Sequence, residues 1–278
     1  MVRRVTGGSR GRAAAPTGKD ADPQECPWHF KGREAKPVAR PQAETVRSLS
    51  VIDVRHLESA VARRATTAVY SIGAVTPAED PLEIVGLHLT LRYAEPADAP
   101  ALFELARDPA VTRFFSWGPY TSVDQPAAYI AGLPEQRERG ELLDFLIMHE
   151  TDGPIGVTGL SELSVRNRHA TVGSWLGHRW WGSGANWESK AMMATLGFDH
   201  LGLDRLTAWA NARNGRSQVA LERVGFRREG VLAGWHRHGD TVHDVVVFGM
   251  LRAAWARSPL RSVPVQVHGT PPAAFVVA

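Results

Sequence analysis

The sequence has few of the features that would place it outside a reducing, aqueous compartment. Cys26 is its only cysteine, so no disulfide can form within the chain and nothing calls for an oxidising environment. The basic segment at the start lacks the apolar stretch of a secretory signal. No run of about 18 apolar residues is present to span a membrane. We therefore expect a cytoplasmic protein with no membrane partner.

Over most of the chain, neither positive nor negative residues are in excess. Residues 1–85 contain 13 Arg and Lys against 10 acids, whereas residues 86–278 contain 19 of each. A neutral domain lacks the concentrated basic face that binds nucleic acid, so we expect no nucleic-acid partner. Residues 1–48 are rich in Gly, Pro, Arg and Ala and cannot bury enough apolar surface to offset their ordering. Apart from loose helical spacing at 50–69, we expect residues 1–85 to form a disordered N-terminal extension.

From residue 87 the sequence becomes periodic. Leu87, Leu89 and Leu91 alternate with polar residues, which is typical of a half-buried strand. Similar patterns predict strands at 87–92, 142–150, 155–163, 169–177, 205–212, 226–236 and 242–250, and helices at 97–107, 122–139, 185–201 and 214–224. This order predicts an α/β domain over 86–256, with a mixed, mostly antiparallel sheet and helices on both faces. The Pro-rich residues 257–278 are expected to form a flexible C-terminal tail.

A glycine-hinged loop opens the helix expected at 185–201. It reads RWWGSGANWES over residues 179–189. Gly182 and Gly184 can adopt backbone angles closed to other residues and allow a ligand to approach the main chain. The first amides of the helix have no partners within it and carry the positive end of its dipole. Together with Arg179 as a cation, this loop favours a phosphate or pyrophosphate group, and hence a phosphorylated cofactor.

Three blocks in order resemble the GCN5-related N-acetyltransferase (GNAT) family, in its RimJ/RimL-like branch that modifies ribosomal-protein N-termini. They are the glycine signature Arg179-Trp180-Trp181-Gly182-Ser183-Gly184, then FDHLGLDRL from Phe198, then NGRSQVALERVGF from Asn214 followed by Glu229-Gly230. The resemblance covers about residues 87–255. It implies the GNAT fold, an acetyl-CoA-dependent N-acetyltransferase activity with acetyl-CoA as co-substrate, and no metal.

The resemblance also implies roles for residues around the loop. The cofactor pyrophosphate would accept bonds from the amides of Gly182, Ser183, Gly184 and Ala185, beside Arg179. The pantetheine arm would pair with the preceding strand near Leu176, Gly177 and His178. Asn214 would bond the pantetheine amides, and Ser217 would bond the sulfur and protonate the leaving thiolate.

The implied reaction is direct attack of an amine on the acetyl carbonyl, which requires a base because an ammonium has no lone pair. Our candidate is His236, where related enzymes can carry a glutamate, since His titrates near neutral pH. His238, His243 and Asp244 in the same hairpin are rivals, and a surface role for all four is equally open. A His-x-His pair without a clear third ligand is not typical of a metal site.

The acceptor is the least specified part of this hypothesis. An aromatic cluster maps to the region that lines the acceptor pocket in such enzymes; we expect Trp117 and Tyr120 to bind substrate and Phe114 to lie in the core. The acceptor would be a protein N-terminal α-amine or a small-molecule amine. The alternative is a non-catalytic CoA-binding regulatory module. Monomer and homodimer both remain open.

Overall fold

The structure, a computed structural model, describes residues 81–277. The extension expected over 1–85 and the helical pattern at 50–69 therefore lie outside the described residues, except for 81–85. The described residues form one sheet of nine strands in the order β7-β8-β6-β5-β4-β3-β2-β1-β9. The strands are β1 (Glu83–Val85), β2 (Leu89–Arg92), β3 (Leu142–His149), β4 (Gly153–Ser164), β5 (His169–Leu176), β6 (Arg205–Asn211), β7 (Arg227–His238), β8 (Thr241–Leu251) and β9 (Gln266–His268).

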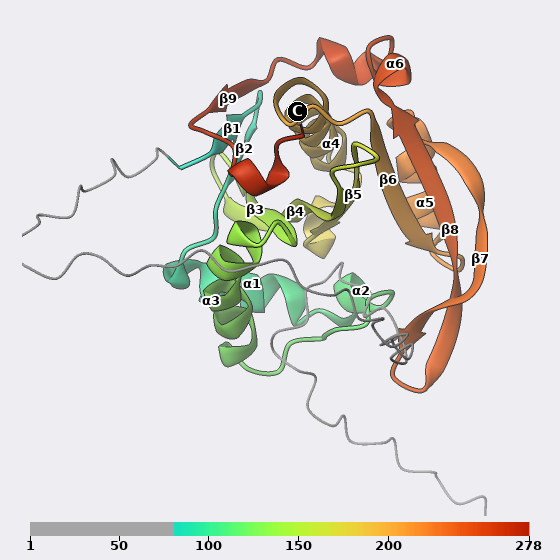
Figure 1. Cartoon of the computed structure of the whole chain (residues 1–278). Helices are drawn as coiled ribbons and strands as arrows, with labels where there is room; N and C mark the ends of the chain where they lie inside the picture. Colours follow the sequence, from blue (N-terminus) through green and yellow to red (C-terminus); the bar gives the residue numbers. More distant parts are fainter. Residues whose placement is uncertain (1–80, 278) are drawn as a thin grey trace, which may run out of the picture. The chain divides into compact units, whose positions relative to one another are not determined.

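Helices cover both faces of this sheet, as the sequence predicts (Figure 1). One face carries α1 (Ala99–Ala106), the short α2 (Pro109–Thr112) and α3 (Asp124–Glu138), and the other carries α4 (Ala185–Thr195) and α5 (Gly215–Arg223). Successive side chains of a strand point to opposite faces. On β5, for example, Val172 packs in the core beneath α4, whereas Trp175 packs in the core beneath α1 and α3. Short helix α6 (Arg252–Trp255) follows β8.

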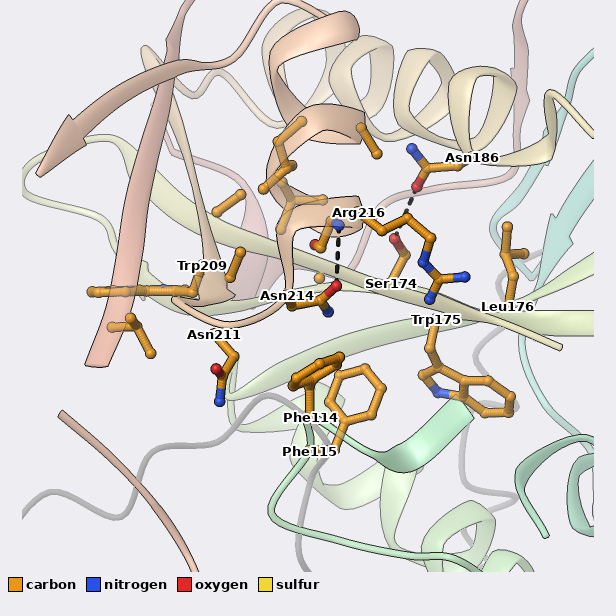
Figure 2. A pocket seen from close by; sticks show the side chains of 18 of the residues that line it. Phe114, Phe115, Ser174, Trp175, Leu176, Asn186, Trp209, Asn211, Asn214 and Arg216 are labelled. Carbon is orange, nitrogen blue, oxygen red and sulfur yellow. Dashed lines mark hydrogen bonds between the residues drawn. The ribbon is translucent and has the colours of Figure 1, made fainter. Parts of the chain in front are cut away.

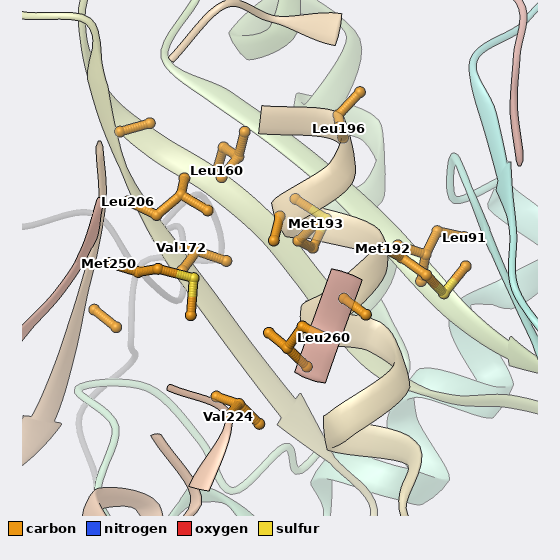
Figure 3. Close-up of a cluster of buried hydrophobic side chains, with 14 of the residues drawn as sticks. Leu91, Leu160, Val172, Met192, Met193, Leu196, Leu206, Val224, Met250 and Leu260 are labelled. Atoms are coloured by element: carbon orange, nitrogen blue, oxygen red, sulfur yellow. The ribbon is translucent and has the colours of Figure 1, made fainter. Parts of the chain in front are cut away.

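Helix α4 is buried on nearly every side and organises the larger core (Figure 3). Met192 and Met193 are 0% exposed, and burying a side chain of this size stabilises the fold by about 1.5–3 kcal/mol. The helix ends differently from the sequence prediction. The α-helical part ends at Thr195, and a π-helical turn follows over Leu196–His200. In this turn Leu201 N donates to Leu196 O at 2.9 Å.

The sheet divides at its one parallel pair. Strands β5 and β6 are joined through three residue pairs, the last being Thr171 with Thr207. Strand β5 then continues to Leu176 and β6 to Asn211, but the two strands no longer pair with each other. All other neighbouring strands are antiparallel. Beyond Thr171, the edge of β5 that faces β6 is therefore open to a ligand, and the two strands form a wedge.

The C-terminal segment is not the flexible tail that the sequence predicts. Strand β9 pairs with β1, and Leu260, Phe275 and Val277 are buried in the larger core. Val277 N also donates to Leu201 O at 2.9 Å. The prediction failed because these apolar residues have no helical or strand period. The domain accordingly includes residues 257–277, and it begins before residue 86, since Leu82 and Ile84 are also core residues.

Within residues 81–277, no helix is both long and apolar enough to cross a lipid bilayer.

Candidate functional site

A cavity of about 250 Å³ occupies the wedge between β5 and β6. Both strands, α4, α5, the glycine loop, the β7–β8 hairpin and the segment after α2 contribute to its walls (Figure 2). Lys190, Arg216 and His236 are the titratable residues that line it, and none of the described lining residues is an Asp or Glu. The cavity is thus electropositive, because Arg216 stays charged and no described carboxylate offsets it.

The glycine loop stands at the edge of the cavity with open backbone positions. Gly182 and Gly184 have φ of +81° and +97°, and a Cβ on either would meet open space. Their amides have no acceptor within the described residues, whereas Ala185 N donates to Ser183 Oγ at 3.2 Å and Ser183 N to Trp180 O at 3.4 Å. Of the four amides expected to bind a pyrophosphate, those of the two glycines are therefore unoccupied, and of the four residues only Gly182 lines the cavity.

Arg179 does not face the cavity as the sequence suggests. Its guanidinium pairs with Asp152 at 2.7 Å, and the side chain is 65% exposed. His178 lies 3.2 Å from Asp108, and Gly177, His178 and Arg179 line a separate surface hollow. Gly177, His178 and Arg179 therefore lie outside the cavity in the wedge.

The cation beside the loop is Arg216, which the sequence analysis missed. Its Cζ lies 3.0 Å from the ring centroid of Trp181, a cation–π contact that links α5 to the loop. Burial lowers the pKa of Arg216, but a guanidinium stays charged in proteins. Trp181 is held in turn by its Nε1, which donates to Leu176 O at 2.9 Å. The signal that would have identified Arg216 is its position at the start of α5, directly before Ser217.

Asn214 and Ser217 lie together on the wall opposite β5. Asn214 is the N-cap of α5, and its Oδ1 accepts from Ser217 N at 3.2 Å (Figure 2). This capping bond leaves the amide group of Asn214 as a donor. The Ser217 hydroxyl has no hydrogen-bond partner within residues 81–277, and both residues line the cavity, as the sequence analysis expects.

Helix α4 contributes a buried lysine that the sequence analysis also missed. Lys190 is 4% exposed, lines the cavity and donates a hydrogen bond to Ser174 Oγ on β5. Asn186, one turn earlier, has its Oδ1 3.5 Å from the same hydroxyl. Burial lowers the pKa of Lys190 to about 7.

The β7–β8 hairpin brings one of its four candidate residues into the cavity. His236 lines the wall, whereas His238, His243 and Asp244 do not. Asp244 Oδ1 accepts from Gly234 N at 2.7 Å. Burial, followed by the neighbouring His238 and His243, lowers the pKa of His236, so the imidazole is neutral at pH 7. Among the described residues, no three His, Cys, Asp or Glu side chains group as metal ligands.

The aromatic wall differs from the expected one. Phe114 and Phe115 line the cavity with Trp175 and Trp209 (Figure 2). Trp117 instead packs in the core at 5% exposure, against Trp175, and Tyr120 packs on Trp117. The expectation that Trp117 and Tyr120 line the acceptor site and that Phe114 is core is therefore wrong. Burial raises the pKa of the Tyr120 hydroxyl, so it stays protonated.

Comparison with known proteins identifies similar domains. The model of the acetyltransferase (GNAT) domain family matches residues 88–227. An uncharacterized N-acetyltransferase of Bacillus licheniformis, p20, is 31% identical over 169 residues, which are 60% of this chain and 95% of p20. A Bacillus subtilis protein with the provisional name ribosomal N-acetyltransferase YdaF is 29% identical over 177 residues, covering 62% of this chain and 95% of that protein.

A solved structure shows the same fold. It is a ribosomal L7/L12 α-N-protein acetyltransferase, RimL, in complex with coenzyme A. It matches with a TM-score of 0.54 and 23% identity, over 60% of this chain and 96% of that one.

Proposed function

This chain belongs to the GNAT acetyltransferase family, within its RimJ/RimL-like branch, and from that premise we propose that it transfers acetyl from acetyl-CoA to a primary amine inside the wedge. The observation that carries the proposal is the division of the sheet at β5 and β6, with the cavity filling the gap. The open edge of β5 offers main-chain groups along one side of an extended ligand. The family acts by acetyl transfer to amines, which agrees with this geometry.

The residues present suit a phosphorylated ligand with an extended polar arm. The unoccupied amides of Gly182 and Gly184 would hold a phosphate at the start of α4. Arg216, at the same edge of the cavity, would add a full positive charge. The Asn214 amide group would donate to the arm. When bound, acetyl-CoA supplies an activated acetyl thioester.

Each step of the chemistry has a candidate residue. His236, neutral at pH 7, would accept the proton that the attacking amine loses. Ser217 would donate its hydroxyl hydrogen bond to the sulfur that leaves. Backbone amides on the open edge of β5 would polarise the acetyl carbonyl. Holding the amine and the thioester in line lowers the barrier by several kcal/mol.

For the acceptor, the cavity favours an amine without additional positive charge. Its walls combine Lys190 and Arg216 with the aromatic residues Phe114, Phe115 and Trp209, and no described lining residue is a carboxylate. Such walls oppose a polycation. A peptide α-amine, with a pKa near 8, is neutral more often than a lysine amine near 10.4. The acceptor is therefore an N-terminal α-amine or an otherwise uncharged small-molecule amine.

The test is thiol release from acetyl-CoA with a panel of peptide N-termini, ribosomal proteins and amine antibiotics. Wild type should turn over one acceptor class. Ser217→Ala and His236→Ala should each lower kcat about tenfold to a hundredfold. His200→Ala, which removes an exposed histidine outside the cavity, should leave it unchanged. Binding of coenzyme A by calorimetry without turnover of any acceptor would instead support a CoA-binding module.

A further inference from the structure

Lys190 is an unusual residue for its position. It is the only lysine after Lys36 in the sequence, it lies in the second turn of α4, and it is 4% exposed. An ammonium has three N–H donors, yet within residues 81–277 the only acceptor for Lys190 is Ser174 Oγ. Because the side chain lines the cavity, its remaining donors can serve a ligand there.

Among residues 81–277, no carboxylate is paired with this buried cation. Glu188 on the same helix accepts from the backbone amides of His88 and Leu89, at 2.8 and 3.0 Å. On β4, Glu162 accepts from the Thr171 hydroxyl at 2.7 Å. The other titratable groups of the cavity, Arg216 on α5 and His236 on β7, are bases.

The other described groups around Lys190 are either uncharged or already paired. Strand β5 contributes the Ser174 hydroxyl, and α4 itself contributes the Asn186 amide. Beside α4, Arg261 of the turn at Pro259–Ser262 pairs with Asp199. Burial is accordingly the cause of the lowered pKa of Lys190. A buried polar group without sufficient partners is costly and points to a function.

We propose that Lys190 binds the cofactor arm: its ammonium donates a hydrogen bond to an amide carbonyl oxygen of the pantetheine chain, while Ser174 fixes the position of the lysine. This inference rests on the proposed function. It adds to that function a charged residue inside the wedge, which acts on cofactor affinity rather than on the acetyl transfer itself.

Position along α4 favours the arm over the phosphates. The unoccupied amides lie before the first turn, at Gly182 and Gly184, whereas Lys190 lies about 8 Å farther along the helix axis from Ala185. Ser174 lies two residues before the end of β5, on the strand whose edge is open. An extended ligand that starts at the loop and follows β5 presents its amide groups at this depth, and amide carbonyls are acceptors for an ammonium.

The first experiment measures the protonation of Lys190 directly. Replacing Lys19, Lys31 and Lys36 with Arg leaves Lys190 as the only lysine of the full chain. A ¹³C-lysine NMR titration then gives the pKa of Lys190 in three samples: the free protein, the protein with coenzyme A, and the protein with 3′-phospho-ADP, which lacks the arm. Coenzyme A should raise the pKa by about one unit or more, because the acceptor favours the charged form, and the nucleotide should not. An equal shift with both ligands, or no shift with coenzyme A, overturns the inference.

The second experiment measures affinity. Lys190→Met should bind coenzyme A about tenfold more weakly than wild type at about pH 6.5, the effect of one charge-assisted hydrogen bond. The difference should shrink toward pH 9.5, where Lys190 is neutral in both the free and bound protein. Arg223→Met, which removes an exposed cation of α5 outside the cavity, should match wild type at both pH values.

The outcomes separate the two levels of the account. If wild type binds coenzyme A and Lys190→Met binds it equally well at both pH values, the role of Lys190 is wrong and the proposed function stands. If wild type does not bind coenzyme A, the proposed function fails and the inference with it. Should Lys190→Met not fold, the NMR titration of the single-lysine protein decides the question alone.

Discussion

At the scale of single residues, the cavity gathers bases without acids. Lys190, Arg216 and His236 come from three different elements and meet around one space, with no described carboxylate on its walls. Burial is the chief cause of a lowered pKa in all three, but the Arg216 guanidinium stays charged. The charge of Lys190 therefore changes near neutral pH and that of His236 below its ordinary range, so the pH dependence of binding and activity tests their roles.

The pH dependence of activity should identify His236 as the base. Because its pKa lies below 6.5, kcat/KM should rise with pH through an acid limb below that value. His236→Gln should lose this limb. His243→Ala should move it to higher pH, since a positively charged neighbour that lowers the pKa of His236 has been removed. A limb that is unchanged in both variants would exclude His236 from the proton transfer.

The stability of the free protein should depend on Lys190 between pH 7 and 10. The folded pKa is about 7 and the unfolded value is about 10.4. In that window the unfolded chain binds more protons, so this residue makes the free energy of unfolding rise with pH; below pH 7 both states are protonated and the full cost of burial remains. The rise should vanish in Lys190→Met. Denaturant unfolding at several pH values measures this, and parallel curves for the two proteins would mean that Lys190 is charged when folded.

The resemblance to the GNAT family implies that Asn214 and Ser217 face the wedge, and both line the cavity. Their roles in binding and catalysis stay predictions. The expected positions of Phe114 and Trp117 are wrong: Phe114 lines the cavity and Trp117 lies in the core. A cluster of aromatic residues in an irregular segment has no periodicity that indicates which ring faces the core. Lys190 was missed because a lysine within a helix ordinarily indicates an exposed face.

At the scale of elements, the wedge and the start of α4 define the site. The parallel contact between β5 and β6 ends at Thr171 and Thr207, while each strand continues. The sequence predicts both strands and the helix between them, but where two strands stop pairing depends on tertiary contacts. Hydrophobic periods of two and 3.6 residues indicate strands and helices and their buried faces. They do not indicate how two strands pair or where their pairing ends.

The glycine before α4 offers a test at this scale. Gly184 has φ of +97° and open space at its Cβ position, so Gly184→Ala is strained by its backbone alone, at a cost of about 1–2 kcal/mol. The variant should unfold at lower denaturant and bind coenzyme A more weakly. Gly215→Ala is the matched control, because this glycine starts α5 at negative φ with open space around it; it should be at least as stable as wild type. Equal stability of both variants would contradict the strained turn.

At the scale of the whole molecule, the C-terminal segment completes the domain. Strand β9 forms one edge of the sheet, and Phe275 is 0% exposed in the core beside α4. The core thus extends beyond the residues 86–256 that periodicity predicts, since Ile84 on one side and Phe275 and Val277 on the other are buried in it. The cytoplasmic location and the choice between monomer and homodimer stay predictions.

Phe275→Ala should destabilise the protein by about 3–5 kcal/mol, the usual effect of removing a fully buried aromatic ring. Val276→Ala, at a neighbouring residue that is 43% exposed, should have a small effect of about 0.5 kcal/mol. Chemical denaturation of both variants measures the contrast. Wild-type stability in Phe275→Ala would restore the interpretation of a loosely attached tail.

The central claim is that the protein transfers acetyl from acetyl-CoA to a free amine in the wedge between β5 and β6. The most direct measurement is mass spectrometry of acceptors incubated with the protein and isotopically labelled acetyl-CoA, comparing each peptide or small molecule with its amine-blocked form. The account predicts label on the free amine of one acceptor class, none on the blocked form, labelling about tenfold to a hundredfold slower in Ser217→Ala, and an unchanged rate in His200→Ala. A protein that binds acetyl-CoA but labels no amine, or labels blocked and free forms alike, would contradict it.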